Sequence, residues 1–472
     1  MTDSAARAID VRAAEVHAAD VHATDVHATD VRTTDIGAGD VHDVRLSQLH
    51  GSLADPAMAS MNFLNEVAIR FPNAISFAAG RPSEEFLDFA EVHRYVDVFI
   101  DHLRRERGMT EAEAKRTVLQ YGRTKGIIHE LVARHLEVDE GISVSSESVV
   151  ITVGCQEAMF LVLRALRTGP QDIVLAISPT YVGLTGAARL VDLPVRPVRG
   201  GERGIDFDDL GAQIAEARAA GLRPRALYLV PDVANPTGIS LDLEARRELL
   251  RVAEAEDLLL LEDNAYGVFA GEGRLPSLKS LDTGRRVVRL GSFAKTVLPG
   301  ARVGYAVADQ RVVDESGGTS LLADHLSTIK SMLTVNTSPW AQAVVGGALV
   351  EHGYSLPAAN RREIDVYQRN LRLILEGLAR RFPSDPAGPL ISWNTPTGGF
   401  FLTLTVPFRA DDELLEYSAK EHGVLWTPMS HFYGGDGGYE QIRLSLSQLT
   451  PDTIDIGLDR LASLVRECAA AR

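Results

Sequence analysis

The sequence predicts an α/β protein with a three-layer αβα large domain, built on one mostly parallel seven-stranded sheet, and a smaller α+β domain. Short apolar runs that suit buried parallel strands alternate with longer helix-like stretches in the middle of the chain. Such alternation is typical of a sheet covered by helices on both faces. The chain also has 472 residues, which is long enough for two domains.

Seven apolar runs are the predicted strands. Helix-like stretches such as Gln156–Leu166 and Leu243–Glu256 separate several of them. The runs are Val149–Val153, Ile173–Ile177, Val195–Val198, Ala226–Val230, Leu258–Leu261, Val287–Leu290 and Val303–Ala308. We therefore expect residues 105–340 to form the large domain, and residues 46–104 and 341–472 to form the small one.

The N-terminal segment has a different pattern. An acidic residue, a Val or Ile, and usually a His or Arg recur every five residues from Asp10 to His42. Because this period keeps no constant face on a helix, the simplest interpretation of residues 1–45 is a disordered tail without a metal. A pentapeptide-repeat β-helix is an alternative, but the units are too few to bury a core. Another alternative is a metal site formed by His17, His22, His27 and His42.

The composition argues against several classes of protein. A net charge of −16 disfavours nucleic acid and anionic membranes as partners. The two cysteines make no disulfide framework, and no apolar run reaches the roughly 18 residues of a membrane span. The N-terminus lacks the charged start and apolar stretch of a signal peptide, so we expect a cytoplasmic protein.

Residues suited to phosphate binding and hydrogen bonding follow two of the predicted strands. After the first strand, Gly154, Cys155 and Gln156 would place free backbone N–H groups at a helix N-terminus, which favours a phosphate. Asn235 follows the fourth strand, next to a proline. A plain strand-to-helix turn and a plain turn asparagine would look the same. However, the carboxyl ends of parallel strands share one edge of a sheet, where ligands gather.

The next two strands end in ionisable groups. Asp263 and Tyr266 follow the fifth strand, and a buried Asp263 needs a partner because desolvating a carboxylate costs several kcal/mol. Ser292, Lys295 and Arg302 follow the sixth strand. Pyridoxal phosphate uses this whole set, since it has a phosphate, a ring nitrogen that pairs with an acid, a phenolic oxygen, and an aldehyde that condenses with lysine. The sequence therefore predicts pyridoxal 5'-phosphate as the cofactor.

These motifs resemble those of the class I/II aminotransferases, pyridoxal-phosphate enzymes of fold type I. The segments that carry the resemblance are LQYGRTKGIIHELV, ITVGCQEAMFLVLRAL, ISPTYVG, VPDVANPTGIS, LLLLEDNAYG, GSFAKTVLPGARVGY, TPTGGFFL and IRLSLS. The resemblance implies the transfer of an amino group between an amino acid and a 2-oxo acid by a ping-pong Schiff-base mechanism. It also implies a homodimer with a shared active site.

The resemblance implies roles around the cofactor ring. Lys295 matches the Schiff-base lysine, which also acts as general acid and base. Asp263 matches the acid that holds the ring-nitrogen proton, and Asn235 and Tyr266 match the donors to the phenolic oxygen. Tyr181 matches the ring that stacks on the pyridine face, although an ordinary packed aromatic would give the same signal.

Further matches concern the phosphate and the substrate. Ser292 and Arg302 match phosphate ligands beside the helix N-terminus at Gly154–Gln156, and Tyr121 matches a phenol that reaches the neighbouring subunit's phosphate. Arg443 matches the arginine that binds the substrate α-carboxylate together with Asn235, with a structural salt bridge as the alternative. Gly80 matches the loop that closes over the substrate. The expected site residues are Gly154, Cys155, Gln156, Tyr181, Asn235, Asp263, Tyr266, Ser292, Lys295, Arg302 and Tyr121 for the cofactor, and Arg443, Gly80 and Asn235 for the substrate.

A looser resemblance concerns the substrate class. The segments MNFLNEVAIRFPNAISFAAGRPSEEFLDF and LQYGRTKGIIHELVARHLEVDEGI are similar to arylglycine (hydroxyphenylglycine-type) aminotransferases of antibiotic biosynthesis. This implies an aromatic or arylglycine amino acid, with 2-oxoglutarate or another 2-oxo acid as its partner. The alternatives are an aminoadipate, kynurenine or branched-chain aminotransferase, or a lyase or oxidase of the same fold. A transcriptional regulator with this fold would need a basic DNA-binding module at the N-terminus, where this chain is acidic.

Overall fold

The computed structural model describes residues 43–55, 58, 60–201, 203–271, 273–383, 390–433 and 437–471. Residues Gly51–Arg472 form one compact unit, which is separate from the unit that ends at His50. The five-residue repeat lies outside the described residues, so its disorder stays a prediction. No described helix has both the length and the apolar composition that a membrane span requires.

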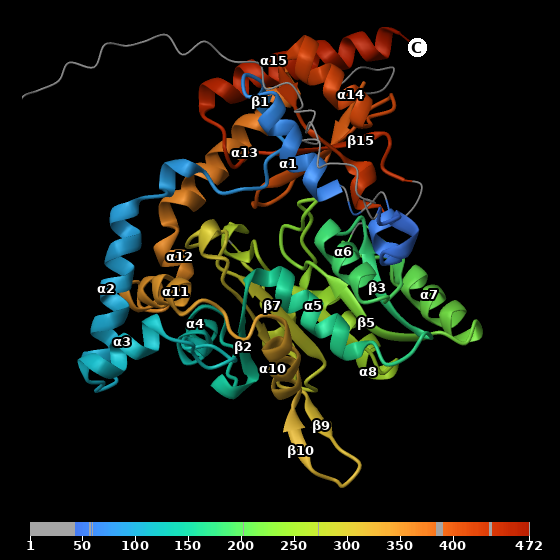
Figure 1. Cartoon of the computed structure of the whole chain (residues 1–472). Helices are drawn as coiled ribbons and strands as arrows, with labels where there is room; N and C mark the ends of the chain where they lie inside the picture. The colour runs from blue at the N-terminus through green and yellow to red at the C-terminus, as the bar shows by residue number, and fades with distance from the viewer. Residues whose placement is uncertain are drawn as a thin grey trace, which may run out of the picture. The chain divides into compact units, whose positions relative to one another are not determined.

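All seven predicted strands occur, and they form one sheet (Figure 1). In spatial order the strands are β2 (Val149–Thr152), β8 (Gly304–Val307), β7 (Val287–Ser292), β6 (Leu259–Asp263), β5 (Arg223–Leu229), β3 (Asp172–Ser178) and β4 (Val195–Arg199). Neighbouring strands are parallel from β7 to β4, whereas β8 runs antiparallel to both β7 and β2. The predicted mostly parallel sheet is therefore confirmed.

The two faces of this sheet are covered by different helices. Strand side chains alternate between faces, so the consecutive residues Leu260 and Leu261 belong to different hydrophobic cores. The core around Leu261 contains residues of α5 (Gly154–Leu166), α6 (Val182–Leu190) and α10 (Leu322–Leu333). The core around Leu260 contains residues of α7 (Phe207–Ala219), α8 (Leu243–Ala255) and α9 (Leu278–Leu281). This arrangement confirms the predicted αβα layers.

A second, antiparallel sheet carries the C-terminal part of the fold. Its strand order is β11 (Ser392–Trp393), β12 (Phe401–Thr405), β15 (Gln441–Ser445) and β14 (Thr427–Pro428). Helices α13 (Arg361–Arg381), α14 (Asp412–Tyr417) and α15 (Pro451–Ala470) accompany it. Strand β1 (Ile75–Ser76) pairs in parallel with β13 (Val424–Leu425), which brings an N-terminal segment to this part. The predicted domain boundaries stay a prediction.

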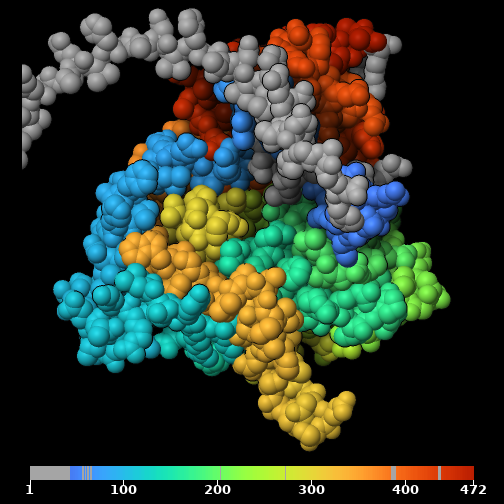
Figure 2. All heavy atoms as spheres, in the orientation of Figure 1, coloured from blue at the N-terminus to red at the C-terminus, as the bar shows by residue number. Residues whose placement is uncertain are grey.

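The remaining helices pack beside β2 and β8. They include α2 (Phe89–Arg105), α3 (Glu111–Leu119), α4 (His129–Glu140), α11 (Pro339–Glu351) and α12 (Leu356–Ala359), while α1 (Ser60–Arg70) precedes β1. A Cβ at Gly347 would lie 1.7 Å from the carbonyl oxygen of Tyr95, so α11 approaches α2 closely because this residue is glycine. A hairpin of β9 (Arg311–Val313) and β10 (Thr319–Leu321) projects away from the seven-stranded sheet (Figures 1 and 2).

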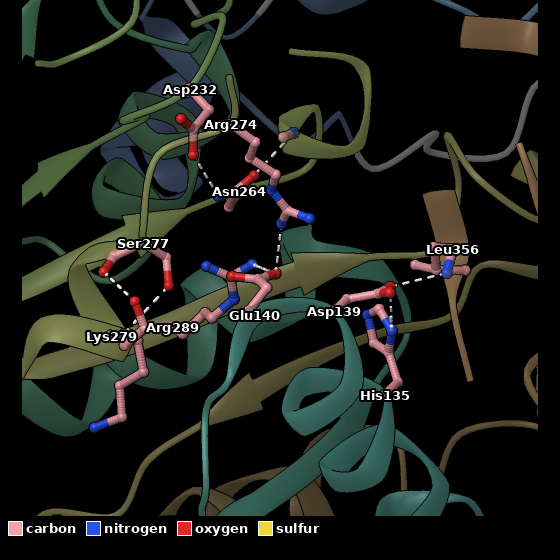
Figure 3. Close-up of polar contacts among 12 residues, drawn as sticks. His135, Asp139, Glu140, Asp232, Asn264, Arg274, Ser277, Lys279, Arg289 and Leu356 are labelled. Atoms are coloured by element: carbon pink, nitrogen blue, oxygen red, sulfur yellow. Dashed lines mark hydrogen bonds and ion pairs between the residues drawn. The ribbon is translucent and has the colours of Figure 1, made fainter. Parts of the chain in front are cut away.

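A buried charge cluster lies between β6, β7 and α4 (Figure 3). Arg289 forms ion pairs with Glu140 and, at 3.4 Å between Nη1 and Oε1, with Glu262. Arg274 pairs with Glu140 at 2.8 Å, and Glu262 also accepts hydrogen bonds from the amides of Leu278 and Lys279. Burial disfavours the charged form of Glu140, but Arg289 and Arg274 hold its pKa below the usual range. Each buried charge of the cluster is therefore stabilised by an opposite charge, and removing one would leave its partner unpaired.

We expect Glu140→Gln to lower the free energy of unfolding by about 3 kcal/mol, because it leaves the buried Arg289 short of a counter-charge. Urea denaturation followed by circular dichroism measures this change. The matched control is Glu244→Gln, which removes an exposed carboxylate paired with Arg247 and should change stability by less than about 0.5 kcal/mol. Equal stability of the two variants would contradict a stabilising role for the cluster.

Candidate active site

Predicted site residues from five different strand ends line one cavity of about 120 Å³. They lie near the carboxyl ends of strands of the large sheet, where parallel α/β folds place their ligands. The predicted residues among the lining are Cys155, Gln156, Tyr181, Asn235, Asp263, Tyr266, Ser292, Lys295 and Arg302. Gly154 and Arg443 contact members of this set from outside the lining.

Lys295 presents its amine inside this cavity. Its Nζ donates a hydrogen bond to the carbonyl oxygen of Gly80 at 2.8 Å and lies 5.7 Å from the centre of the Tyr266 ring. Burial, followed by the positive charges of Arg302, Arg443 and Arg81, lowers the pKa of Lys295 to about 8. A substantial fraction of the amine is therefore neutral, and so nucleophilic, near pH 8.

Asp263 is a buried acid that has hydrogen-bond donors but, among the residues that the structure describes, no ion-pair partner. Its carboxylate accepts hydrogen bonds from the hydroxyl of Tyr228 at 2.6 Å and from the thiol of Cys155 at 3.5 Å. No ion pair joins it to a base within the described residues. Burial raises the pKa of Asp263 even though both donors lower it. A protonated ring nitrogen would therefore provide the counter-charge that this carboxylate lacks.

The start of α5 and Arg302 together form a cradle whose charge and free amides suit an anion. Gly154 has φ +70°, and a Cβ there would lie 2.5 Å from Nη2 of Arg302. The first amides of a helix have no intrahelical acceptor, so they are free to bind a phosphate together with the guanidinium. Ser292 lines the same cavity, and its hydroxyl accepts a hydrogen bond from the amide of Ala294. Glycine is required at position 154 because a side chain would fill the cradle.

Arg443 is a buried cation without a carboxylate partner among the described residues. Its Nη1 donates to Oδ1 of Asn235 at 2.7 Å, its Nη2 donates to the carbonyl oxygen of Ala78 at 2.9 Å, and its Nε has no partner. The rings of Phe401 and Phe432 lie 4.3 and 5.0 Å from its Cζ. Burial lowers the pKa of Arg443 to about 10. An unpaired buried guanidinium is well suited to bind a substrate carboxylate.

Side chains that follow Arg443 hold the loop that contains Gly80. The hydroxyl of Ser445 donates to the carbonyl oxygen of Ala79, and that of Ser447 donates to the carbonyl oxygen of Arg81 at 2.6 Å. Residues 443 and 445 alternate along β15, so they lie on one side of it, and Ser447 follows in the turn after the strand. Sequence reasoning missed these two serines, although their period of two in IRLSLS was a usable signal.

Sequence reasoning also missed Tyr228, which lies within the apolar run Ala226–Val230. The only available signal was a phenol between leucines in a buried strand, because a buried tyrosine hydroxyl usually has a partner. Tyr181 and Tyr266, the two aromatic residues that the sequence did predict for this cavity, are part of its lining. Burial raises the pKa of Tyr181 to about 12, which keeps its phenol protonated.

Tyr121 is the predicted site residue that the structure does not bring to this cavity. It is 81% exposed and is absent from the described lining. A second cavity of about 440 Å³ adjoins the first and shares Tyr181 and Asn235 with it. Its described lining contains no charged side chain, whereas that of the smaller cavity contains Asp263, Lys295 and Arg302.

Comparisons with known proteins agree with this geometry. The family model Aminotransferase class I and II matches residues 83–461. The (S)-3,5-dihydroxyphenylglycine transaminase of Amycolatopsis orientalis is 58% identical over 420 residues, which cover 89% of this chain and 94% of that protein. The 2-aminoadipate transaminase of Thermus thermophilus is 31% identical over 403 residues, which cover 84% and 91% of the two chains.

Solved structures support the same conclusion. LysN, the alpha-aminoadipate aminotransferase of Thermus thermophilus, matches with a TM-score of 0.71 at 30% identity, over 90% of this chain and 100% of that chain. That crystal contains N-(5'-phosphopyridoxyl)-L-leucine. The multiple substrate aminotransferase of Thermococcus profundus matches with a TM-score of 0.76 at 25% identity, over 90% and 99% of the chains. The chain therefore belongs to the class I and II aminotransferases and is a pyridoxal-phosphate-dependent transaminase of fold type I.

Proposed function

We propose that the amino acid substrate of this transaminase is an arylglycine and that its partner is a 2-oxo acid such as 2-oxoglutarate. The observation that carries this proposal is the 58% identity to (S)-3,5-dihydroxyphenylglycine transaminase over nearly the whole of both chains. The 2-aminoadipate transaminase is only 31% identical, so a dicarboxylic amino acid as the main donor is the weaker candidate. The predicted cytoplasmic location and a role in antibiotic biosynthesis stay predictions.

Arg443 and Asn235 would orient the substrate. The guanidinium of Arg443 is held by Asn235 and by the backbone of Ala78, and it would bind the α-carboxylate in a planar, two-bond arrangement. This contact would fix one substituent of Cα and so restrict the orientations of the substrate in front of Lys295. The buried Phe401 and Phe432 exclude water around this ion pair and thereby strengthen it.

Lys295 would move the proton that transamination requires. When bound, pyridoxal phosphate supplies an electron-accepting ring that stabilises negative charge at Cα. The Lys295 amine, with its lowered pKa, would take the Cα proton as a general base and return it to the cofactor carbon as a general acid. Asp263, held by Tyr228 and Cys155, would keep the ring nitrogen protonated during this step.

We further propose a homodimer whose active sites are shared. Exposed apolar residues come from residues 119–121 and residues 332–340. These two segments lie close together at Gly122, where a Cβ would be 3.7 Å from both Asn336 and Pro339. The exposed residues are Leu119, Tyr121, Met332, Leu333, Val335 and Trp340. A surface of this kind favours burial against a second copy of the chain. Tyr121 would then reach the phosphate cradle of the partner subunit.

The substrate proposal is tested with a panel of amino donors in the presence of 2-oxoglutarate. We expect kcat/KM for (S)-hydroxyphenylglycine or (S)-3,5-dihydroxyphenylglycine to exceed that for 2-aminoadipate, kynurenine and leucine by about tenfold or more, as differential binding of the side chain requires. Chromatography of the amino acid products provides the measurement. A preference for 2-aminoadipate or for a branched-chain donor would contradict the proposal.

The role of Lys295 predicts how cofactor uptake depends on pH. The apoenzyme should attach pyridoxal phosphate faster as the pH rises through about 8, because the neutral amine is the nucleophile, and the rate should level off above that pH. An unperturbed lysine would extend this rise to about pH 10.4. Stopped-flow absorbance measures the rate.

Lys295→Ala should retain the fold but form no covalent link to the cofactor, as mass spectrometry after borohydride reduction would reveal. The control Lys420→Ala changes an exposed lysine and should behave like the wild-type protein. A reduced adduct in the Lys295→Ala protein would disprove the assignment.

The proposed shared site predicts complementation between a variant with low activity and an inactive one. Tyr121→Ala should lower activity by about tenfold or more, because it removes a hydrogen bond to a charged group, and Lys295→Ala should abolish activity. After unfolding and refolding the two together, mixed dimers contain one intact site, so activity should recover to about a quarter of the wild-type value for random pairing. No recovery, with mixed dimers confirmed by native mass spectrometry, would mean that Tyr121 does not act across the interface.

A further inference from the structure

A buried ion pair lies at the first turn of α5, the helix whose N-terminus forms part of the cradle. Lys330 of α10 donates a hydrogen bond from its Nζ to Oε2 of Glu157 at 2.7 Å, and the two side chains are 0% and 6% exposed. Neither side chain belongs to the described lining of the cavity that contains Lys295. The proposed function therefore gives this pair no role.

The carboxylate of Glu157 holds the backbone immediately before the cradle. Its Oε2 also accepts a hydrogen bond from the amide of Val153 at 2.6 Å. Val153 is the N-cap residue of α5, and a valine side chain cannot accept a hydrogen bond from the helix. Glu157 satisfies this amide instead, so its position influences the direction of the amides that follow, those of Gly154, Cys155 and Gln156.

The end of α10 and the segment after it hold this carboxylate in turn. The hydroxyl of Thr334 donates to Oε1 of Glu157 at 2.7 Å and accepts a hydrogen bond from Nζ of Lys330 at 2.9 Å. Several donors on one carboxylate favour its charged form. The hydroxyl of Thr337 donates to the carbonyl oxygen of Ile151 at 3.1 Å, so the same segment also contacts the strand that leads into the cradle.

The position of Glu157 creates an electrostatic conflict that Lys330 resolves. A carboxylate in the first turn stabilises a helix, but a phosphate bound at the same helix end would be repelled by it. Water screens this repulsion only weakly because the carboxylate is buried. The ammonium of Lys330 supplies the opposite charge, so Glu157 can hold the backbone without opposing an anion in the cradle.

We propose that Glu157 and Lys330 are positioning residues for the phosphate group of the cofactor. Glu157 orients the amides at the start of α5, and Lys330 offsets the negative charge that this function introduces. The inference rests on the phosphate lying in the cradle, and neither residue would touch the cofactor. Their effect should therefore depend on the phosphate and disappear for a cofactor analogue without one.

The test compares two ligands of the full-length protein after its cofactor has been removed. They are pyridoxal phosphate and pyridoxal, which has the same ring and aldehyde but a hydroxymethyl group in place of the phosphate ester. Absorbance titration gives both Kd values, and Kd for pyridoxal divided by Kd for pyridoxal phosphate measures what the phosphate contributes.

Lys330→Met should lower this ratio about tenfold or more, because it leaves a buried anion uncompensated beside the cradle, and should leave Kd for pyridoxal within about twofold. The double variant Glu157→Gln with Lys330→Met removes both charges and retains an acceptor for the Val153 amide. Its ratio should return to within about threefold of the wild-type value.

Two further variants separate this role from a general effect on stability. Lys279→Met removes another buried lysine, which pairs with Asp282 and Asp309 and belongs to α9 on the other face of the sheet. It should lower stability and leave the ratio unchanged. Thr334→Val keeps both charges and should lower the ratio about threefold, so it tests the inference even if Lys330→Met does not fold.

Arg302→Gln shows whether the cradle itself holds the phosphate, and it should also lower the ratio about tenfold or more. A lowered ratio in Arg302→Gln but not in Lys330→Met would overturn this inference alone. A double variant as impaired as Lys330→Met would also overturn it, because the charge of Glu157 would then not be the cause. An unchanged ratio in Arg302→Gln would overturn both the inference and the assignment of the phosphate to the cradle.

Discussion

Two adjacent carboxyl groups buried in the same strand impose the main constraint on this active site. Glu262 and Asp263 end β6 and point to opposite faces of the sheet. Burying a carboxylate is unfavourable unless charges or donors compensate, so each face needs its own partners. On one face, Arg289 and two backbone amides compensate Glu262. On the other, Tyr228 and Cys155 compensate Asp263 only in part, which leaves it suited to a cationic cofactor ring.

The same physical logic applies to Arg443, the residue proposed to bind the substrate carboxylate. Arg443 is desolvated and hydrogen-bonded, yet it has no counter-ion among the described residues. The guanidinium of Arg443 can therefore take an anion of a bound ligand as its ionic partner. A protein that maximised its own stability would pair such a charge internally, so the unpaired state is a cost that the proposed binding of a substrate carboxylate would explain.

Much of this arrangement follows from local sequence patterns. Short apolar runs predicted all seven strands, and the residues after those runs predicted most of the cavity, because parallel strands deliver their carboxyl ends to one edge. Asn235, Asp263 and Lys295 were found in this way. The identity of the substrate could not follow from these patterns, since they describe the chemistry common to many transaminases.

What the sequence did not reveal depends on pairing between distant segments. Arg289 lies in an apolar run, and its partner Glu140 belongs to a helix that precedes it by 149 residues. Tyr228 and Ser447 likewise acquire their roles only through Asp263 and the loop at Arg81, to which no local period connects them. Tyr121 adds a different limit, because its phenol is exposed and outside the described lining of the cavity, so its role across a subunit interface stays a proposal.

The hydroxyl contacts from Ser445 and Ser447 have a mechanical consequence. They join the loop of Gly80, whose carbonyl oxygen contacts Lys295, to β15 and the turn after it, so this loop and the strand that contains Arg443 are held together. Any displacement of Arg443 on capturing an anion would be transmitted to Gly80, whose carbonyl oxygen contacts the lysine. Recognition of the incoming acid and release of the amine from its resting hydrogen bond would then be one coupled event.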